Sequence, residues 1–542
     1  MASPRLSPFN SRRLLAIVFL FPVIAQAADT GTLATEATGN GLQAIDWFII
    51  ATYALSTLFL GWWFSRKQKD TSEYFVGSGN MNPLLIGVSL FATLLSTISY
   101  MSFPGEALGK GPVYLTRILC YPVVFLVVGF ILLPVYMKLR VTSAYELLEK
   151  KLGLSVRLLG ASLFLILRLF WMSLLVYLTA KAIAIMIGVD ENYIPWIVVV
   201  TGGFAITYTS LGGLRAVVIT DLMQTILLYG GALLVIGTIT VKMGGFSWFP
   251  TEWQTDIWDS QPVFSLDPST RLTVVGSFLS VLIWYCCTAG GDQVSIQRFM
   301  ATKDAKTARK AIGMQLIVSA TVAVTLFITG FALLGYFQAD PQLLPAGMTL
   351  NENADKIFPH FIAFHLPPVV SGLVVAGLFA AAMSSIDSGV NSITAVVMTD
   401  FLERFGKKPE SERKQVLVAR GLAVGIGVAV VLSSTLIEQV PGNITAVTTK
   451  TVNLFTVPIF ILFFFALFVP FANAAGVWIG VSCSIFTAIL ISFSGPIFGM
   501  NEQGLDPVSF EWISPAALLV GISVGSLACK IFSTNRTDPS TA

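Results

Sequence analysis

The segment 380–392, AAAMSSIDSGVNS, carries polar side chains inside one of the most apolar parts of the chain. On a helix, Ala381, Ser384, Ser385 and Ser388 fall at positions i, i+3, i+4 and i+7, so they share one continuous face. Hydroxyl and carbonyl oxygens are hard donors that suit an alkali cation better than zinc or copper. The pattern therefore predicts a cation site on this face. The alternative is that small residues allow close helix packing here.

The serines of one helix cannot complete a cation's coordination shell, so further oxygen ligands must come from another segment. Two other segments have a composition that could provide them. Backbone carbonyls become available where a membrane helix is broken. The segment 89–111 carries Ser96, Thr97 and Ser99, and the segment 286–293 carries two adjacent glycines. Breaks at corresponding positions of two five-helix halves indicate a transporter binding site between inverted repeats.

Ionisable residues within the predicted membrane spans are further candidates for function, because charges inside a membrane are costly and rare. They are Arg117, Arg168, Lys181, Asp221, Asp292 and Asp387. For each of them the alternative is an ion pair that joins two helices. Lys181 lies near the end of its span, so its side chain can extend to the surface.

The composition indicates what kind of protein holds these residues. The chain has 542 residues, of which 55% are hydrophobic and only 12% are charged, whereas soluble domains carry about 25% charged residues. Length and hydropathy together predict one large helical membrane domain. The net charge of +3 gives no basis for nucleic-acid binding, and the five cysteines lie in apolar segments without a disulfide or metal-binding pattern.

The sequence lacks the motifs of common enzyme classes. It has no Walker motif, no dinucleotide-binding motif and no Ser/His/Asp arrangement. We therefore expect neither an enzyme nor an ATP-driven pump, and no cofactor. His360 and His365 are interpreted as packing or surface residues, because two histidines alone seldom form a metal site.

Apolar runs long enough to cross a bilayer follow one another along the chain. They must be helical, because lipid offers no hydrogen bonds to the backbone and continuous apolarity excludes barrel strands. The about thirteen predicted spans are 43–64, 83–104, 111–137, 157–186, 192–210, 214–241, 270–297, 311–337, 368–401, 416–436, 446–469, 471–493 and 511–531.

The first residues resemble a targeting signal rather than a span. Arg12 and Arg13 precede the run LLAIVFLFPVIA, which is followed by AQA ending at Ala27. This order predicts a secretory signal peptide at 1–27, because the apolar run is too short to span a bilayer. An uncleaved extra helix is the alternative.

Lysine and arginine predict how the spans are oriented, because they concentrate on the cytoplasmic side. An outside N-terminus puts most of them in cytoplasmic connections, including Arg298 in the connection that follows the span 270–297. The outer connections then hold only Lys110, Lys242, Arg271, Lys356 and Lys450. We therefore expect a bacterial-type inner membrane protein with its N-terminus outside and its C-terminus in the cytoplasm.

Five stretches together resemble the sodium/solute symporter family, which includes sodium–sugar and sodium–sialate symporters with a LeuT-like core. They are TSEYFVGSGNM (71–81), SAYELLEKKLG (143–153), YTSLGGLRAVVITDLMQ (208–224), DQVSIQRFMATKDA (292–305) and GLFAAAMSSIDSGVNS (377–392). The resemblance implies a leading helix, ten core helices in two inverted halves, and two trailing helices. The corresponding parts are 43–64 (leading helix), 83–241 (first repeat), 270–469 (second repeat), 471–531 (trailing helices) and 532–542 (cytoplasmic tail).

The resemblance also implies where sodium binds. The family's main site lies between the first and eighth core helices, and here it is formed by the carbonyls of Ala92, Leu95 and Ala381 and the hydroxyls of Ser384 and Ser385. This set agrees with the serine face that the periodicity predicts.

A second sodium site occurs in some relatives, and the matching residues here are Asp221, Ser384 and Ser388. The chain departs from many relatives at Asp387, where a hydroxyl residue is frequent. A carboxylate at 387 has three interpretations: it strengthens a second sodium site, it titrates, or it pairs with a cation such as Arg168.

For the solute, the resemblance implies a pocket between several core helices. The matching residues are Ser96, Ser99, Arg117, Arg168, Tyr285, Lys450 and Asn453. Arg168 offers bidentate recognition of a carboxylate, which favours a sialic acid or another organic acid over a neutral sugar. The alternative for Arg168 is a salt bridge to Asp387 or Asp292.

The sequence thus predicts a sodium-coupled symporter that imports a small organic solute by alternating access. The alternatives are a sodium–hexose symporter, a symporter driven by protons through Asp221 and Asp387, and a membrane sensor that has lost transport. The expected partners are the solute, Na⁺ and the lipid bilayer, with no nucleic acid. We expect a monomer or a weak oligomer.

Overall fold

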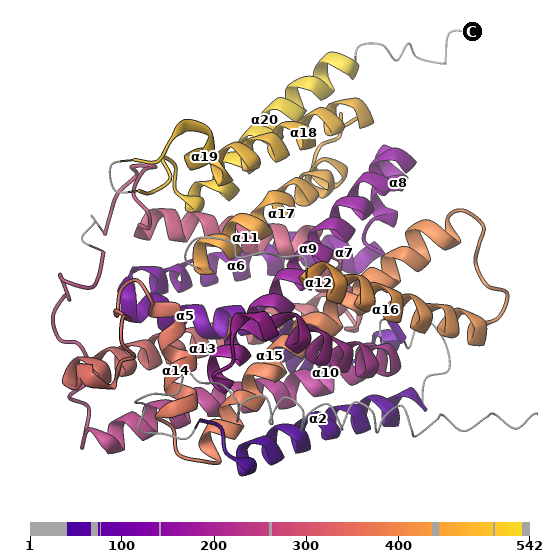
Figure 1. The fold of residues 1–542 in the computed structure, drawn as a ribbon. Helices are drawn as coiled ribbons and strands as arrows, with labels where there is room; N and C mark the ends of the chain where they lie inside the picture. Colours follow the sequence, from indigo (N-terminus) through magenta and orange to yellow (C-terminus); the bar gives the residue numbers. More distant parts are fainter. Residues whose placement is uncertain are drawn as a thin grey trace, which may run out of the picture.

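A computed structural model describes residues 41–66, 74–75, 77–139, 143–259, 263–435, 444–501 and 504–533. Within these ranges every regular element is a helix, and Figure 1 shows the bundle that they form. The predicted all-helical fold is therefore confirmed. The predicted signal peptide at 1–27 lies outside the described residues, and so does the tail from 534 onwards.

The chain is organised as a series of long helices joined by short ones. The first part comprises α2 (Ala44–Ser65), η1 (Gly77–Gly79), α4 (Pro83–Leu94), α5 (Thr97–Gly109), η2 (Pro112–Cys120), α6 (Tyr121–Val127), η3 (Val128–Leu132), α7 (Leu133–Leu139), α8 (Glu146–Leu152), α9 (Leu154–Ile187), η4 (Glu191–Tyr193) and α10 (Ile194–Lys242). The second part comprises α11 (Val274–Gly291), α12 (Gln293–Met300), α13 (Ala305–Ala339), η5 (Pro341–Leu343), α14 (Ala354–Phe364), α15 (Val370–Val396), η6 (Val397–Glu403), α16 (Glu412–Thr435), α17 (Ile444–Phe468), α18 (Ala474–Ser492), α19 (Ser494–Phe498), η7 (Phe510–Trp512) and α20 (Ile513–Ser533).

Eleven of the described helices are long and apolar enough to cross a membrane, or twelve if α4 and α5 count as one bent span. The predicted number of about thirteen is not confirmed. The predicted span 192–210 forms the first part of α10, and only Gly213–Lys242 of that helix meets the same test. The 49 residues of α10 are divided by a kink at Gly213, where φ is 62°. Glycine is the residue that adopts such a φ without strain.

Helix α15 lies at the centre of the bundle and packs against α2, α4, α9 and α10. In its most apolar stretch 83% of the residues are buried, the highest share among the spans. Figure 1 shows α2 along the lower edge, and α18 and α20 along the upper edge. The polar segment 380–392 is therefore held inside the protein rather than against lipid.

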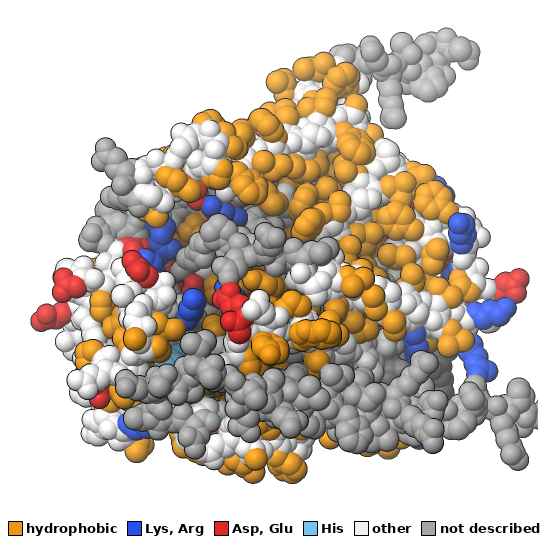
Figure 2. All heavy atoms as spheres, viewed as in Figure 1, with side chains coloured by type: hydrophobic (Ala, Val, Ile, Leu, Met, Phe, Trp, Pro, Cys, Tyr) orange, Lys and Arg blue, Asp and Glu red, His pale blue; other side chains and the backbone are white. Residues whose placement is uncertain are grey.

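The outer surface has the distribution of side chains that a bilayer requires. Large apolar side chains are exposed on α18 and α20, including Phe486 (62% exposed) and Leu519 (70% exposed). Figure 2 shows hydrophobic side chains spread over this upper region, whereas charged side chains gather mainly toward the helix ends at the left and right. Soluble monomers rarely expose continuous apolar surfaces of this kind, so the fold is that of an integral membrane protein.

Candidate functional site

The first core helix is broken where the sequence predicts it. Helix α4 ends at Leu94, Leu95 and Ser96 are extended, and α5 begins at Thr97 with a bend of 69° between the two helices. The break frees carbonyl groups at the end of α4 from their intrahelical donors. The Thr97 hydroxyl donates to the carbonyl oxygen of Leu378 at 3.0 Å, which ties the break to α15.

The serine face of α15 lies against this break. The Ser385 hydroxyl donates to the carbonyl oxygen of Thr93 at 3.4 Å, so it points at the broken segment. The other members of the predicted main sodium set, Ala92, Leu95, Ala381 and Ser384, are all buried in the same core. The Ser385 hydroxyl and the free helix end thus meet in one place, which is the kind of hard-oxygen environment that suits an alkali cation.

The second helix break, between α11 and α12, has a different local chemistry. Here the carbonyl of Gly290 accepts a hydrogen bond from the hydroxyl of Tyr136, and the carbonyl of Gly291 accepts one from Tyr145 at 3.3 Å. The protein itself therefore satisfies these freed carbonyls. This contrast favours the first break as the place where an ion binds.

The predicted second sodium set also comes together, around Asp221 of α10. The two carboxylate oxygens of Asp221 accept hydrogen bonds from Ser384 and Ser89, each at 2.5 Å. The Ser388 hydroxyl lies 3.0 Å from that of Thr93 and donates to Asp387 at 3.3 Å. The Ser384 hydroxyl therefore donates to the second set, while the lone pairs of its oxygen remain available to the main set.

A residue that the sequence interpretation missed lies within this second set. Arg298 is fully buried, although we expected it in a cytoplasmic connection. Its guanidinium donates to Ser388 at 2.5 Å and to Ser89 at 2.8 Å, and it lies 3.6 Å from a carboxylate oxygen of Asp221. The expectation is wrong because the broken helix continues as α12 to Met300, which carries Arg298 into the core. Arg298 lies in the segment 292–305, one of the five that resemble the symporter family, and this position could have indicated a functional role.

A cavity of about 140 Å³ adjoins the first break, because Thr93, Leu94 and Leu95 are part of its wall. Five of the seven residues predicted to bind the solute line it, namely Ser99, Arg117, Arg168, Tyr285 and Asn453. The other two do not. Ser96 begins α5, where its hydroxyl accepts from the backbone N–H of Ser99 at 3.4 Å, and Lys450 forms an ion pair with Asp506.

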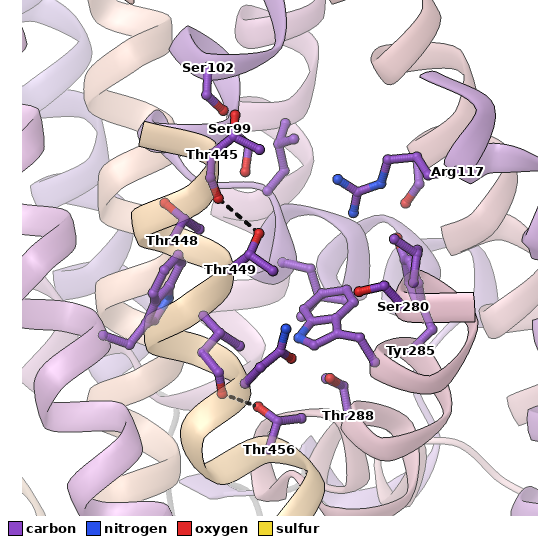
Figure 3. Close-up of a pocket in the computed structure, with 18 of the residues that line it drawn as sticks. Ser99, Ser102, Arg117, Ser280, Tyr285, Thr288, Thr445, Thr448, Thr449 and Thr456 are labelled. Atoms are coloured by element: carbon purple, nitrogen blue, oxygen red, sulfur yellow. Dashed lines mark hydrogen bonds between the residues drawn. The ribbon is translucent and has the colours of Figure 1, made fainter. Parts of the chain in front are cut away.

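Further polar residues of the cavity were not singled out from the sequence. They are Ser102, Ser280, Thr288, Ser319, Thr445, Thr448, Thr449, Thr456 and Glu511; Asp292, which the sequence did single out, also lines the cavity. Figure 3 shows the threonines of α17 along one side of the cavity, with Arg117, Ser280 and Tyr285 across from them. The four threonines at 445, 448, 449 and 456 share one face of a helix, and this spacing could have indicated a polar cavity wall.

Arg168 forms an ion pair with Asp292 inside the cavity wall, and both side chains are buried. This is the alternative that the sequence left open for Arg168. Asp292 also begins α12, because its carboxylate accepts from the backbone N–H of Val294 at 2.9 Å. The positive charge of Arg168 is thus compensated within the protein.

The two histidines lie together at the end of α14, His360 within the helix and His365 directly after it, and α14 is not among the membrane spans. Their Nε2 atoms are 3.4 Å apart. Burial lowers the pKa of each to about 4, and for His365 the nearby His360 and Lys242 add to the effect. In the described parts of the chain, no group of three or more His, Cys, Asp or Glu side chains is arranged to hold a metal ion. The pair packs against the aromatic rings of its surroundings, Phe361 among them.

Known proteins resemble this chain over most of its length. A model of the sodium:solute symporter family matches residues 74–483. The sodium/sialic acid symporter NanT of Aliivibrio fischeri is 30% identical over 501 residues, covering 91% of this chain and 94% of that protein. The sodium/sialic acid symporter SiaT of Proteus mirabilis is 31% identical over 462 residues, covering 84% and 90%.

A solved structure extends the similarity to the fold. The substrate-bound outward-open state of a Na⁺-coupled sialic acid symporter aligns with a TM-score of 0.79 and 27% identity, covering 90% of this chain and 98% of the other. The family match spans most of the chain, and the helical architecture agrees with it. This chain therefore belongs to the sodium:solute symporter family and couples the transport of a small solute to sodium.

Proposed function

We propose that the coupling sodium binds between the α4–α5 break and the serine face of α15, and that the solute is a carboxylate-bearing organic molecule of the sialic acid type. The observation that carries this proposal is the contact of Ser385 with the broken segment at Thr93, directly beside the polar cavity. The sodium ligands are the carbonyls of Ala92, Leu95 and Ala381 and the hydroxyls of Ser384 and Ser385.

Coupling follows from the wall that the two sites share. Residues 93–95 end the first half of the broken helix and also line the cavity, so an ion that orders this segment also orders one side of the solute pocket. Each sodium that enters down a potential of 100 mV contributes about 2.3 kcal/mol, in addition to its concentration gradient. A main site built from neutral oxygens binds sodium weakly enough to release it inside.

The second set bears on how many ions move in each cycle. The guanidinium of Arg298 already lies among Asp221, Ser89 and Ser388. A second sodium at Asp221, Ser384, Asp387 and Ser388 therefore has to displace this guanidinium from the carboxylate. This requirement supports the first break as the primary coupling site.

The membrane arrangement is part of the proposal. The N-terminus lies outside and the C-terminus in the cytoplasm, because this orientation puts most lysines and arginines inside. Residues 83–241 and 270–469 form the two inverted repeats, and the α4–α5 and α11–α12 breaks occupy corresponding places in them. Large apolar faces on α18 and α20 support contact with a bilayer rather than with an obligate partner. The protein then acts as a monomer or a weak oligomer.

Uptake of labelled sialic acid into proteoliposomes tests the proposal. We expect an inward sodium gradient to drive accumulation, and an unlabelled neutral hexose to compete poorly. Uptake that follows a proton gradient and ignores sodium would assign coupling to protons. Preferred uptake of a hexose would identify a sugar symporter. Sodium-dependent ligand binding without any uptake would identify a sensor.

A further inference from the structure

Among the described residues that line the cavity, one cation has no carboxylate partner. The charged residues that line the cavity are Arg117, Arg168, Asp292 and Glu511. Arg168 is paired with Asp292. Glu511 accepts hydrogen bonds from the Ser277 hydroxyl and, at 3.0 Å, from the backbone N–H of Thr273, so it is held at the start of α11. Arg117 remains.

The environment of Arg117 is neutral and aromatic. Its guanidinium donates to the Tyr114 hydroxyl, and its central carbon lies 4.6 Å from the centre of the Tyr114 ring and 5.5 Å from that of Phe103. Its buried Nε atom has no hydrogen-bond partner among the residues that the structure describes. Among the described residues, no carboxylate lies within ion-pair distance of Arg117. A guanidinium taken out of water without a counter-charge costs several kcal/mol, so this site calls for an anion.

The geometry points to Arg117, rather than Arg168, as the residue that binds the solute's carboxylate; this assignment rests on the proposed function. Figure 3 shows the Arg117 side chain extending into the cavity toward the threonine row of α17. The guanidinium offers a planar fork that matches a carboxylate. The Tyr114 and Phe103 rings hold that fork in place. The ligand supplies the counter-charge that the protein lacks.

Other polar residues of the cavity wall indicate the rest of the ligand. Within the described ranges, Thr288 and Thr448 present buried hydroxyl oxygens without a hydrogen-bond partner, and Asn453 presents a buried amide oxygen without one. All three line the cavity. Buried polar atoms without partners are unfavourable, so a ligand with several hydroxyl or amide groups completes them. The predicted class is a monocarboxylate on a polyhydroxylated body, such as a sugar acid.

Two substitutions at one position test the assignment. Arg117→Gln removes the charge, and Arg117→Lys keeps the charge but not the planar fork. Arg309→Gln is the matched control, because Arg309 also stacks on an aromatic ring, Phe130, but lies outside the cavity. Each variant is assayed for uptake of sialic acid and of its uncharged methyl ester, and for the rise in unfolding temperature that sodium causes.

We expect Arg117→Gln to raise the KM for sialic acid by about tenfold to a hundredfold and to abolish the preference for the acid over the ester. Arg117→Lys keeps part of that preference, and Arg309→Gln behaves as wild type. The sodium-induced rise in unfolding temperature stays in every variant, which shows that each one is folded. An unchanged preference in Arg117→Gln overturns the assignment but leaves sodium-coupled uptake intact. Wild-type protein that prefers the ester overturns it as well.

Discussion

Replacing Ser385 with alanine tests the main sodium site directly. The hydroxyl lies against the broken segment and is one of five oxygens in the proposed shell. The existing hydrogen bond to Thr93 is long, at 3.4 Å, so its loss costs the fold no more than about 1 kcal/mol. The protein should therefore stay folded while its sodium site loses one ligand.

The expected magnitude follows from the charge of the ion. Hydrogen bonds to charged groups contribute about 1.5–3 kcal/mol, and we take this as the scale for one neutral oxygen on sodium. Each 1.4 kcal/mol is a factor of ten in the dissociation constant. Ser385→Ala should thus weaken sodium binding by roughly tenfold to a hundredfold.

Two assays measure this loss. In proteoliposomes, the sodium concentration that gives half-maximal uptake should rise by that factor. In detergent, at a sodium concentration well above both dissociation constants, the stabilisation by sodium should fall by about 1.4 kcal/mol for each tenfold loss of affinity. Ser392→Ala is the matched control, because Ser392 is buried two helical turns further along α15, where its hydroxyl donates to Gln297 at 2.7 Å. A half-maximal sodium concentration equal to that of wild type would refute the ligand role of Ser385.

Two further predictions concern other parts of the molecule. Arg168→Gln should lower the free energy of unfolding by about 3–5 kcal/mol, because it leaves the buried charge of Asp292 without its partner. The double variant with Asp292→Asn should recover most of this loss in chemical unfolding, and no recovery would argue against the ion pair. Stability should also fall as the pH drops from about 6.5 to about 4, because the folded protein keeps His360 and His365 neutral while the unfolded chain binds protons. In the His365→Gln variant the unfolding temperature should depend less steeply on pH in this range. An unchanged slope would show that the histidine pair does not cause the loss of stability.

The sequence by itself determined the features that depend on a single helix. Apolar runs predict spans because lipid excludes unpaired backbone groups. Ser384, Ser385 and Ser388 fall on one face because 3.6 residues make a helical turn. Ser96 and Thr97 lie in the segment that was expected to be broken, and the break is there. These predictions need only local periodicity and composition.

The tertiary structure decided the features that depend on how helices rotate against one another. Arg298 reaches Asp221 from a segment 77 positions away along the printed sequence. Arg168 forms an ion pair with Asp292, which compensates its charge within the protein. Arg117 instead faces the threonines of α17. Charged residues within spans could each be assigned to a ligand or to an ion pair. Only the packing decides which carboxylate lies within reach of each arginine. The periodicity of one helix shows which of its faces is buried, but not which residues of other helices lie against that face.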